Sequence, residues 1–350
     1  MHAPNFTSRT YLAAALVVGA FGIGTIAAGA ETRPFTDAAG RQVEIPAVVH
    51  RVFAAGVPAA VLLYVMAPEA MLGWPGELAP DAKAMLPASY AQLPVVGRLT
   101  GRHATAKPES VAALHPDLIL DVGTVDAHYA ALADQVQKSS GVPYVLIDGK
   151  LEHSAATFRL LGPVLGQTAR AELLARAAET LITAAQAARD GMKTRRRIYY
   201  ARGGDGLETA PPGSIVAEIM ALAGGVNVAE DVGGAGLATV PLERVISWSP
   251  DLVLVSSAAL YQLIAGDAHW HDVQAVAEHR LYLAPSAPFG WLEEPPGVNR
   301  LAGLPWLAGI LADGAPPARI KDIARDFYRL FYHVELDEAQ LARLLASPQP

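Results

Sequence analysis

The stretch "PESVAALHPDLILD" at residues 108–121 returns in altered form as "PLERVISWSPDLVL" at residues 241–254. In both, a glutamate near the start is followed two residues later by valine, and Pro-Asp-Leu then leads into an aliphatic run. Glu109 and Glu243 are 134 positions apart in the sequence. Proline and acidic residues suit the first turn of a helix, and an unbroken aliphatic run predicts a strand buried on both faces. The chain therefore repeats a helix–turn–strand unit, although separate α/β lobes also share such turns by chance.

Strand patterns surround each of the two units. In the first half, "HRVFAAG" (50–56) and "VPYVLID" (142–148) predict buried strands, and in the second half "RRRIYYARGG" (195–204) and "RLYLAPS" (280–286) do the same. Helical patterns separate these strands. Buried strands that alternate with helices imply parallel sheets covered on both faces. The predicted fold class is α/β, with two Rossmann-like lobes.

The segment between the two halves contains no strand candidate. Residues 168–191 run without proline or an internal glycine, and a helix of this length spans about 36 Å. We interpret this helix as a stiff connector between the lobes, because a second α/β series begins directly after it. An ordinary surface helix of one domain is the alternative. The predicted organisation is a signal peptide at 1–30, a first lobe at 31–151, a helical linker at 152–192 and a second lobe at 193–350.

The first thirty residues predict export. A stretch rich in Ala and Gly follows Arg9 and ends in "AGA" at residues 28–30, which matches the small-x-small pattern of a signal-peptidase site. A membrane anchor is the alternative, because the stretch is nearly long enough to span a bilayer. We expect cleavage, and a soluble mature protein in a bacterial periplasm.

Composition excludes several classes of partner. The formal net charge of −7 supplies no positive stripe for a phosphate backbone, so we expect no nucleic-acid partner. The chain has no cysteine, which excludes disulfides, thiolate metal sites and a lipid-carrying cysteine.

The order of these motifs resembles the class III, helical-linker, periplasmic substrate-binding proteins of metal-chelate ABC importers. Those proteins take up ferric siderophores, haem and vitamin B12. The resemblance covers residues 33–335 and implies two Rossmann-like lobes joined by a long α-helix, with the solute captured between them. It also implies a monomer that is not an enzyme, holds no cofactor and delivers its ligand to a permease dimer. The segments that carry it are "RVFAAGVPAAVLLYVMAPEAMLGWPG", "PVVGRLTGRHATAKPESVAALHPDLILDVG", "GVPYVLIDG" and "AEIMALAGGVNVAED" with the "VPLERVISWSPDLVLV" that follows.

The resemblance also gives the repeated glutamates a role. In the family's vitamin B12-binding member, a glutamate at the matching place in each lobe pairs with arginines of the permease. Glu109 and Glu243 are therefore the expected docking residues. Two such contacts held at a fixed separation reinforce each other, although each exposed pair is worth only about 0.2–1 kcal/mol. The alternative is that each glutamate merely favours its helix N-terminus.

Ligands of open parallel sheets gather beyond the carboxyl ends of the strands, where two facing lobes form a cleft. Arg102 and Arg202 would suit anionic groups of a chelate, although Arg102 could equally be a solvated loop charge. The loop "APFGWLEEPP" offers Trp291 to a flat ligand, and Trp74 could lie in the cleft or in the core. The full set of ligand-binding candidates is Trp74, Arg102, His103, Tyr129, Tyr200, Arg202, Phe289 and Trp291.

No metal site and no catalytic motif is predicted. His103 has no second ligand at a fixed local spacing, and "HWH" (269–271) places its histidines on diverging sides of a helix. The sequence has no nucleophile elbow, zinc-protease helix or phosphate-binding loop, so an exported two-lobed hydrolase is a remote alternative. We expect capture of a ferric siderophore, with haem, cobalamin, a nickel chelate or an oxyanion as alternative ligands.

Overall fold

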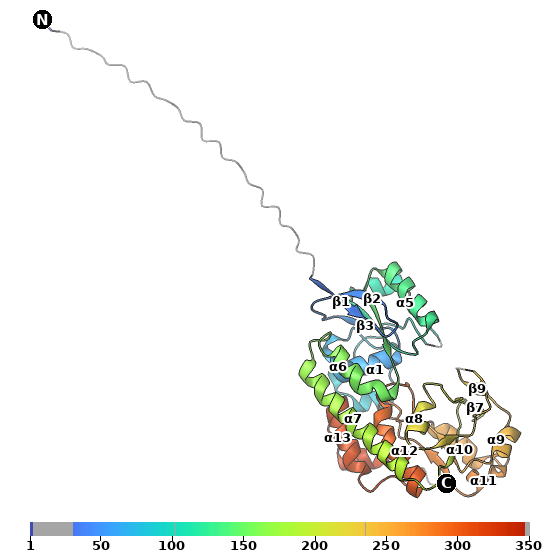
Figure 1. Ribbon diagram of the computed structural model, residues 1–350. Helices are drawn as coiled ribbons and strands as arrows, with labels where there is room; N and C mark the ends of the chain where they lie inside the picture. Colours follow the sequence, from blue (N-terminus) through green and yellow to red (C-terminus); the bar gives the residue numbers. More distant parts are fainter. Residues whose placement is uncertain (3–30, 102, 235, 347–350) are drawn as a thin grey trace.

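The computed structural model describes residues 1–2, 31–101, 103–234 and 236–346. Two α/β lobes are joined by the long helix α7 (Thr168–Gly191), as Figure 1 shows. The predicted fold class and connector helix are thereby confirmed. The predicted signal peptide lies outside the described residues, apart from residues 1–2. Within the described parts of the chain, no helix is long and apolar enough to cross a membrane.

The first lobe is built on a parallel sheet in the order β3-β4-β5. Its strands are β3 (Val52–Ala54), β4 (Leu118–Gly123) and β5 (Tyr144–Asp148). An isolated parallel β-bridge between Val52 and Met71 extends this sheet on the outer side of β3. All three strands are buried, as their aliphatic sequences predict.

The second lobe repeats this sheet. Its parallel strands are β6 (Arg197–Tyr200), β8 (Val226–Asn227), β10 (Leu252–Val255) and β11 (Leu281–Leu283), in the order β11-β10-β6-β8. β6, β10 and β11 correspond to β3, β4 and β5, and β8 takes the place of the bridge at Met71. Both lobes therefore share one strand order.

The repeated sequence unit makes the same contacts in each lobe. The N–H of Asp117 donates to the carbonyl of Arg51, and the N–H of Asp251 donates to the carbonyl of Arg197. A second hydrogen bond joins each pair, because the aspartate carboxylate accepts from the N–H of the same arginine. The distance is 2.8 Å for Arg51 and Asp117, and 2.6 Å for Arg197 and Asp251. Each arginine side chain also donates to backbone carbonyls shortly before the Pro-Asp-Leu turn. Arg51 donates to Leu114 and His115, and Arg197 donates to Trp248. The Pro-Asp-Leu turn thus fixes the start of two neighbouring strands in both lobes.

Helices cover the sheets, and two short antiparallel ribbons flank them. The ribbons pair β1 (Thr32–Thr36) with β2 (Gln42–Pro46) and β7 (Glu208–Thr209) with β9 (Ala238–Thr239). The other α-helices are α1 (Val57–Met66), α2 (Pro80–Met85), α3 (Ala88–Ala91), α4 (Pro108–Ala112), α5 (Ala127–Ser140), α6 (Ser154–Leu161), α8 (Glu218–Leu222), α9 (Leu242–Trp248), α10 (Ala258–Gly266), α11 (Gln274–Ala277), α12 (Arg300–Asp313), α13 (Ile320–Tyr332) and α14 (Glu338–Leu344). The described residues also form the 3₁₀ turns η1 (Pro68–Ala70), η2 (Leu151–His153) and η3 (Trp270–Asp272).

One hydrophobic core runs through both lobes. It contains the inner faces of both sheets, for example Leu120 of β4 and Leu254 of β10. Leu174 of α7 and Leu304 of α12 belong to the same core, and these two helices pack against each other. Each sheet has a separate, smaller core on its outer face. The lobes are therefore joined by packed side chains as well as by the connector.

The end of the chain returns to the first lobe. Helix α13 packs against α1, and the Tyr64 hydroxyl donates to the carbonyl of Tyr332. Arg170 of the connector donates to the carbonyl of Leu330 at 2.9 Å. The sequence places these residues in the second lobe, 193–350, and that division of the chain stays a prediction. The apolar face of α13 is visible in the sequence, but the partner that covers it lies more than 250 residues away.

Candidate functional site

A cavity of about 480 Å³ lies between the two lobes. The first lobe contributes Gly56 after β3, residues 121–124 at the end of β4, and Tyr129 in the first turn of α5. The second lobe contributes Arg202 after β6 and the loop residues 293–296. The cavity thus occupies the expected place, beyond the carboxyl ends of the parallel strands of both lobes.

Glycine at position 56 lets the first strand end close to its neighbours. A methyl group added there would lie 2.7 Å from the Thr100 hydroxyl and 3.9 Å from the Asp121 carboxylate. Helix α1 begins directly after Gly56, with Pro58 in its first turn. Its first two residues line the cavity, so the positive end of the helix dipole faces the cavity.

Asp121 is a buried carboxylate on the floor of this cavity. Its side chain accepts hydrogen bonds from the Tyr144 hydroxyl at 2.8 Å and the Thr100 hydroxyl at 3.1 Å. The N–H of Val122 donates to it at 3.0 Å. Burial raises the pKa of Asp121, while these hydrogen bonds oppose the shift. Asp121 carries no signal in the sequence, because an aspartate at the end of an aliphatic run forms no local motif.

Arg202 is held between two carboxylates of its own lobe. Its guanidinium contacts Glu293 through Nε and Glu208 through Nη1, the latter at 2.8 Å. The Glu293 side chain is only 2% exposed. Arg202 therefore lines the cavity, but its charge is already neutralised by the protein.

Glu294 follows in the same loop and faces the cavity. Its backbone φ is +65°, in the left-handed region that a non-glycine residue seldom adopts. Among the described residues, no group donates a hydrogen bond to its carboxylate. Desolvation and the neighbouring Glu293 carboxylate raise the pKa of Glu294. Glu294 is thus an acceptor without a protein partner at a ligand-sized cavity.

The two predicted tryptophans and Phe289 are not among the residues that line this cavity. Trp291 is fully buried, and its indole N–H donates to the Tyr328 hydroxyl at 3.2 Å. Phe289 is 4% exposed and Trp74 2% exposed, and their rings lie 6.0 Å apart in the core. The tight loop after β11 turns its aromatic side chains toward α13 and α1, which leaves its glutamates and prolines at the cavity.

The four remaining predicted ligand residues differ in where they lie. Tyr129 lines the cavity, and burial together with Asp121 raises its pKa. Tyr200 is buried behind the cavity and its hydroxyl lies 3.1 Å from that of Ser256. His103 is exposed, and its carbonyl accepts from Arg98, while Arg102 lies outside the described residues.

No metal centre is evident in the described part of the chain. Within it, no three His, Asp or Glu side chains are grouped closely enough to hold an ion. In "HWH", the His269 ring lies 3.1 Å from Asp267, whereas the His271 ring contacts the carbonyl of Ala265. The two rings have separate local partners.

Glu109 and Glu243 occupy the first turns of α4 and α9, and both are exposed. Each helix precedes a central strand of its lobe, α4 before β4 and α9 before β10. Neither carboxylate has a hydrogen-bond or ion-pair partner among the described residues.

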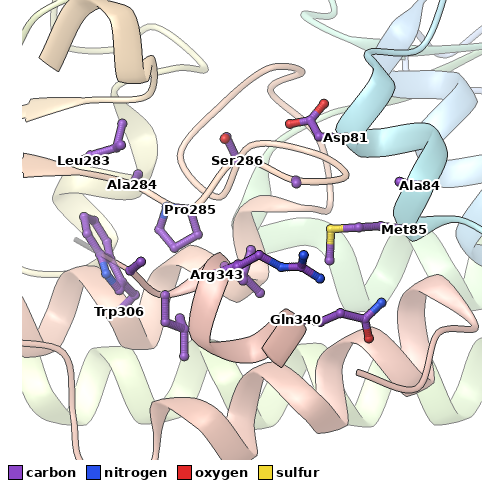
Figure 2. A pocket seen from close by; sticks show the side chains of 14 residues that line it. Asp81, Ala84, Met85, Leu283, Ala284, Pro285, Ser286, Trp306, Gln340 and Arg343 are labelled. Carbon is purple, nitrogen blue, oxygen red and sulfur yellow. The ribbon is translucent and has the colours of Figure 1, made fainter. Parts of the chain in front are cut away.

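Two other cavities lie at the boundary between the lobes. One of about 630 Å³ adjoins the first, because Gly123, Thr124 and Ile215 line both. Another, of about 450 Å³, lies between α2 and α14, with Met85 and Arg343 on facing sides (Figure 2). The latter shares no lining residue with the cavity at Arg202.

A family model described as "Periplasmic binding protein" matches residues 72–288, which is more than half of the chain. The chain belongs to the periplasmic binding protein family. Membership implies a periplasmic location. No curated protein matches the sequence.

Solved structures of periplasmic binding proteins share the fold over nearly their whole length. An ABC transporter solute binding protein from Sulfurospirillum deleyianum is 26% identical, with a TM-score of 0.81, over 89% of this chain and 98% of that one. A periplasmic solute binding protein from Veillonella parvula is 22% identical, with a TM-score of 0.71, over 90% and 97%. The molybdate-bound MolA of Haemophilus influenzae is 22% identical, with a TM-score of 0.68, over 87% and 99%.

Proposed function

We propose that this periplasmic binding protein is the solute-binding component of an ABC importer and captures a metal chelate, with a ferric siderophore as the favoured ligand. The observation that carries the proposal is the cavity of about 480 Å³ at the strand ends of both lobes. It falls in the range of about 300–1,000 Å³ that buries a drug-sized ligand.

The alternative ligand is a free oxyanion, because the similar protein MolA is described with molybdate bound. Size argues against it here. A tetrahedral oxyanion has about five heavy atoms and fills a small fraction of the space, which the adjoining cavity of about 630 Å³ enlarges further. The cavity volume favours a chelate.

Delivery to the permease is proposed to use Glu109 and Glu243. Both are exposed, both lack a partner among the described residues, and both occupy the same place in equivalent lobes. Two rigidly spaced carboxylates suit a pair of basic sites on a permease dimer. The binding protein is proposed to act as a monomer.

Calorimetric titration tests the capture. The panel is a ferric trihydroxamate, a ferric tricatecholate, haemin, nickel–histidine and molybdate, each against the mature protein and against Tyr129→Ala. We expect at least one chelate to bind at a one-to-one ratio, and to bind more weakly to the variant, because Tyr129 lines the cavity. Molybdate as the sole ligand would overturn the chelate assignment. Chelate binding that Tyr129→Ala leaves unchanged would place capture elsewhere.

A further inference from the structure

The charged side chains that line the inter-lobe cavity bear on the net charge of the ligand that it can bind. Arg202 is the cation that the second lobe contributes among the described lining residues, and Glu293 and Glu208 both contact its guanidinium. Its side chain is only 15% exposed. An anionic ligand would compete with two carboxylates that are already in place, so Arg202 is poorly suited to select an anion.

The first lobe does not reverse this balance. Its described lining cation is Arg98, whose Nε donates to the carbonyl of His103 at 2.7 Å. The positive end of α1 also faces the cavity, but the Asp121 carboxylate lies beside it at Gly56. Helix-dipole effects of this kind are worth about 0.3–1 kcal/mol, and Asp121 offsets this one from within the protein.

Carboxylates outnumber cations around the cavity. Among the described lining residues, Asp121, Glu293 and Glu294 face two arginines, and Glu208 adds a further carboxylate behind Arg202. Asp121 and Glu293 have donors within the protein. Glu294 has none among the described residues, and it lies on a loop whose neighbouring side chains are anchored in the core. An unpaired acceptor on a fixed loop is suited to a donor on the ligand.

We propose that the cavity selects chelates of zero or positive net charge, and that Glu294 receives a cationic or hydrogen-bond-donating group of the ligand. This inference rests on the proposed capture of a chelate and adds the charge class of that chelate. It distinguishes the cavity from one that binds oxyanions or strongly anionic chelates, because such ligands would meet a described lining in which carboxylates outnumber guanidinium groups.

A matched pair of probes isolates the charge. The first probe is a ferric trihydroxamate with a free terminal ammonium, which is singly positive. The second is the same chelate with that amine acetylated, which is neutral and nearly identical in size. A ferric tricatecholate, which is triply negative, and molybdate complete the series. Each is titrated calorimetrically into the mature protein at low and at high salt.

We expect the positive chelate to bind about tenfold more tightly than its acetylated form, the order of a hydrogen bond to a charged group. The preference should shrink at high salt because the contact is partly exposed. Glu294→Gln keeps the shape and backbone of the loop, and should reduce the preference to near unity. Glu44→Gln removes an equal charge from an exposed position on β2, outside the cavity lining, and should leave the preference unchanged.

Three outcomes overturn the inference. Tighter binding of the tricatecholate or molybdate than of both hydroxamates would show that the cavity selects anions. Equal affinity for the acetylated and the free-amine chelates would show that no carboxylate of the cavity binds the ammonium group. A preference that survives in Glu294→Gln would remove Glu294 from the site. If no chelate of any charge binds, the proposed capture itself fails, which is a different result from a reversed charge order.

Discussion

Replacing Arg300 by methionine tests how the two lobes are held at the base of the cleft. Arg300 is fully buried at the start of α12. Its guanidinium donates to the carbonyl of Gly149 in the first lobe at 3.0 Å and to Glu218 in the second lobe at 3.1 Å. It also donates to the carbonyls of Ile215 and Gly297.

Glu218 extends this contact back into the first lobe. Its carboxylate accepts from the N–H of Leu151 at 2.9 Å and from that of Glu152 at 3.3 Å. Methionine fills much of the arginine volume but leaves Glu218 without its cationic partner, and it removes the donor to the carbonyls of Gly149, Ile215 and Gly297. Removing one member of a buried ion pair typically costs about 3–5 kcal/mol. We expect a loss of that order in the free energy of unfolding.

Urea denaturation followed by circular dichroism measures the loss. Arg159→Met is the matched control, because Arg159 pairs with Glu172 and Glu179 on the surface and its side chain is 41% exposed. That substitution should cost much less than the change at Arg300, because exposed ion pairs contribute little to stability. A loss below about 1 kcal/mol for Arg300→Met, or equal losses for both variants, would refute the assignment of Arg300 as the buried link between the lobes.

Three further predictions concern docking, pH and closure. Reversal of Glu109 and Glu243 to Lys should abolish stimulation of the reconstituted permease ATPase without changing ligand affinity. Glu44→Lys should change neither the stimulation nor the affinity. A loss of ligand affinity on reversal of Glu109 and Glu243 would contradict the docking role. Burial, together with the nearby Arg170, lowers the pKa of His333 below its ordinary value of 6.5. The unfolded chain therefore takes up this proton first as the pH falls, so stability should fall from about pH 6.5 downward until the lowered folded-state pKa is passed. The urea midpoint should show this slope, and His333→Gln should flatten it; an unchanged slope would remove His333 as its source. Small-angle scattering should give a radius of gyration of about 20 Å. This radius should change by only a few tenths of an ångström when ligand binds, because the shared core limits closure of the lobes. A marked fall in the radius of gyration would contradict that limit.

The sequence predicted those parts of the fold that rest on local patterns. The aliphatic runs at β4 and β10 appear as central buried strands, and the uninterrupted helical stretch became α7. The repeat is closer in structure than in residue identity. His115 and Ser249, which are 134 positions apart, both adopt positive φ, at +49° and +46°. A shared turn conformation in two different residues gives no signal that composition or periodicity can detect.

The site was harder to predict, because burial inside a loop is decided by tertiary contacts. Trp291 and Phe289 lie in a segment rich in proline and glycine, which the sequence analysis placed at the cleft. The structure packs both into the core instead, where Trp291 finds Tyr328 of α13 as its hydrogen-bond partner. That helix is far along the chain, so no spacing rule connects it with the loop. Asp121 was missed for a related reason, since its donors come from Thr100 and Tyr144.

The same loop explains why a shared fold need not imply a shared ligand. Its aromatic residues belong to the core that joins α1, α13 and the second lobe, so the fold constrains them. Its carboxylates face the cavity, where Glu293 contacts Arg202 and Glu294 has no partner in the described chain. Substitutions at the cavity-facing positions can change the charge of the site while the buried positions keep the lobes together. Ligand preference in this protein is therefore expected to depend on a few loop carboxylates, and the strand order and connector set only where the ligand binds.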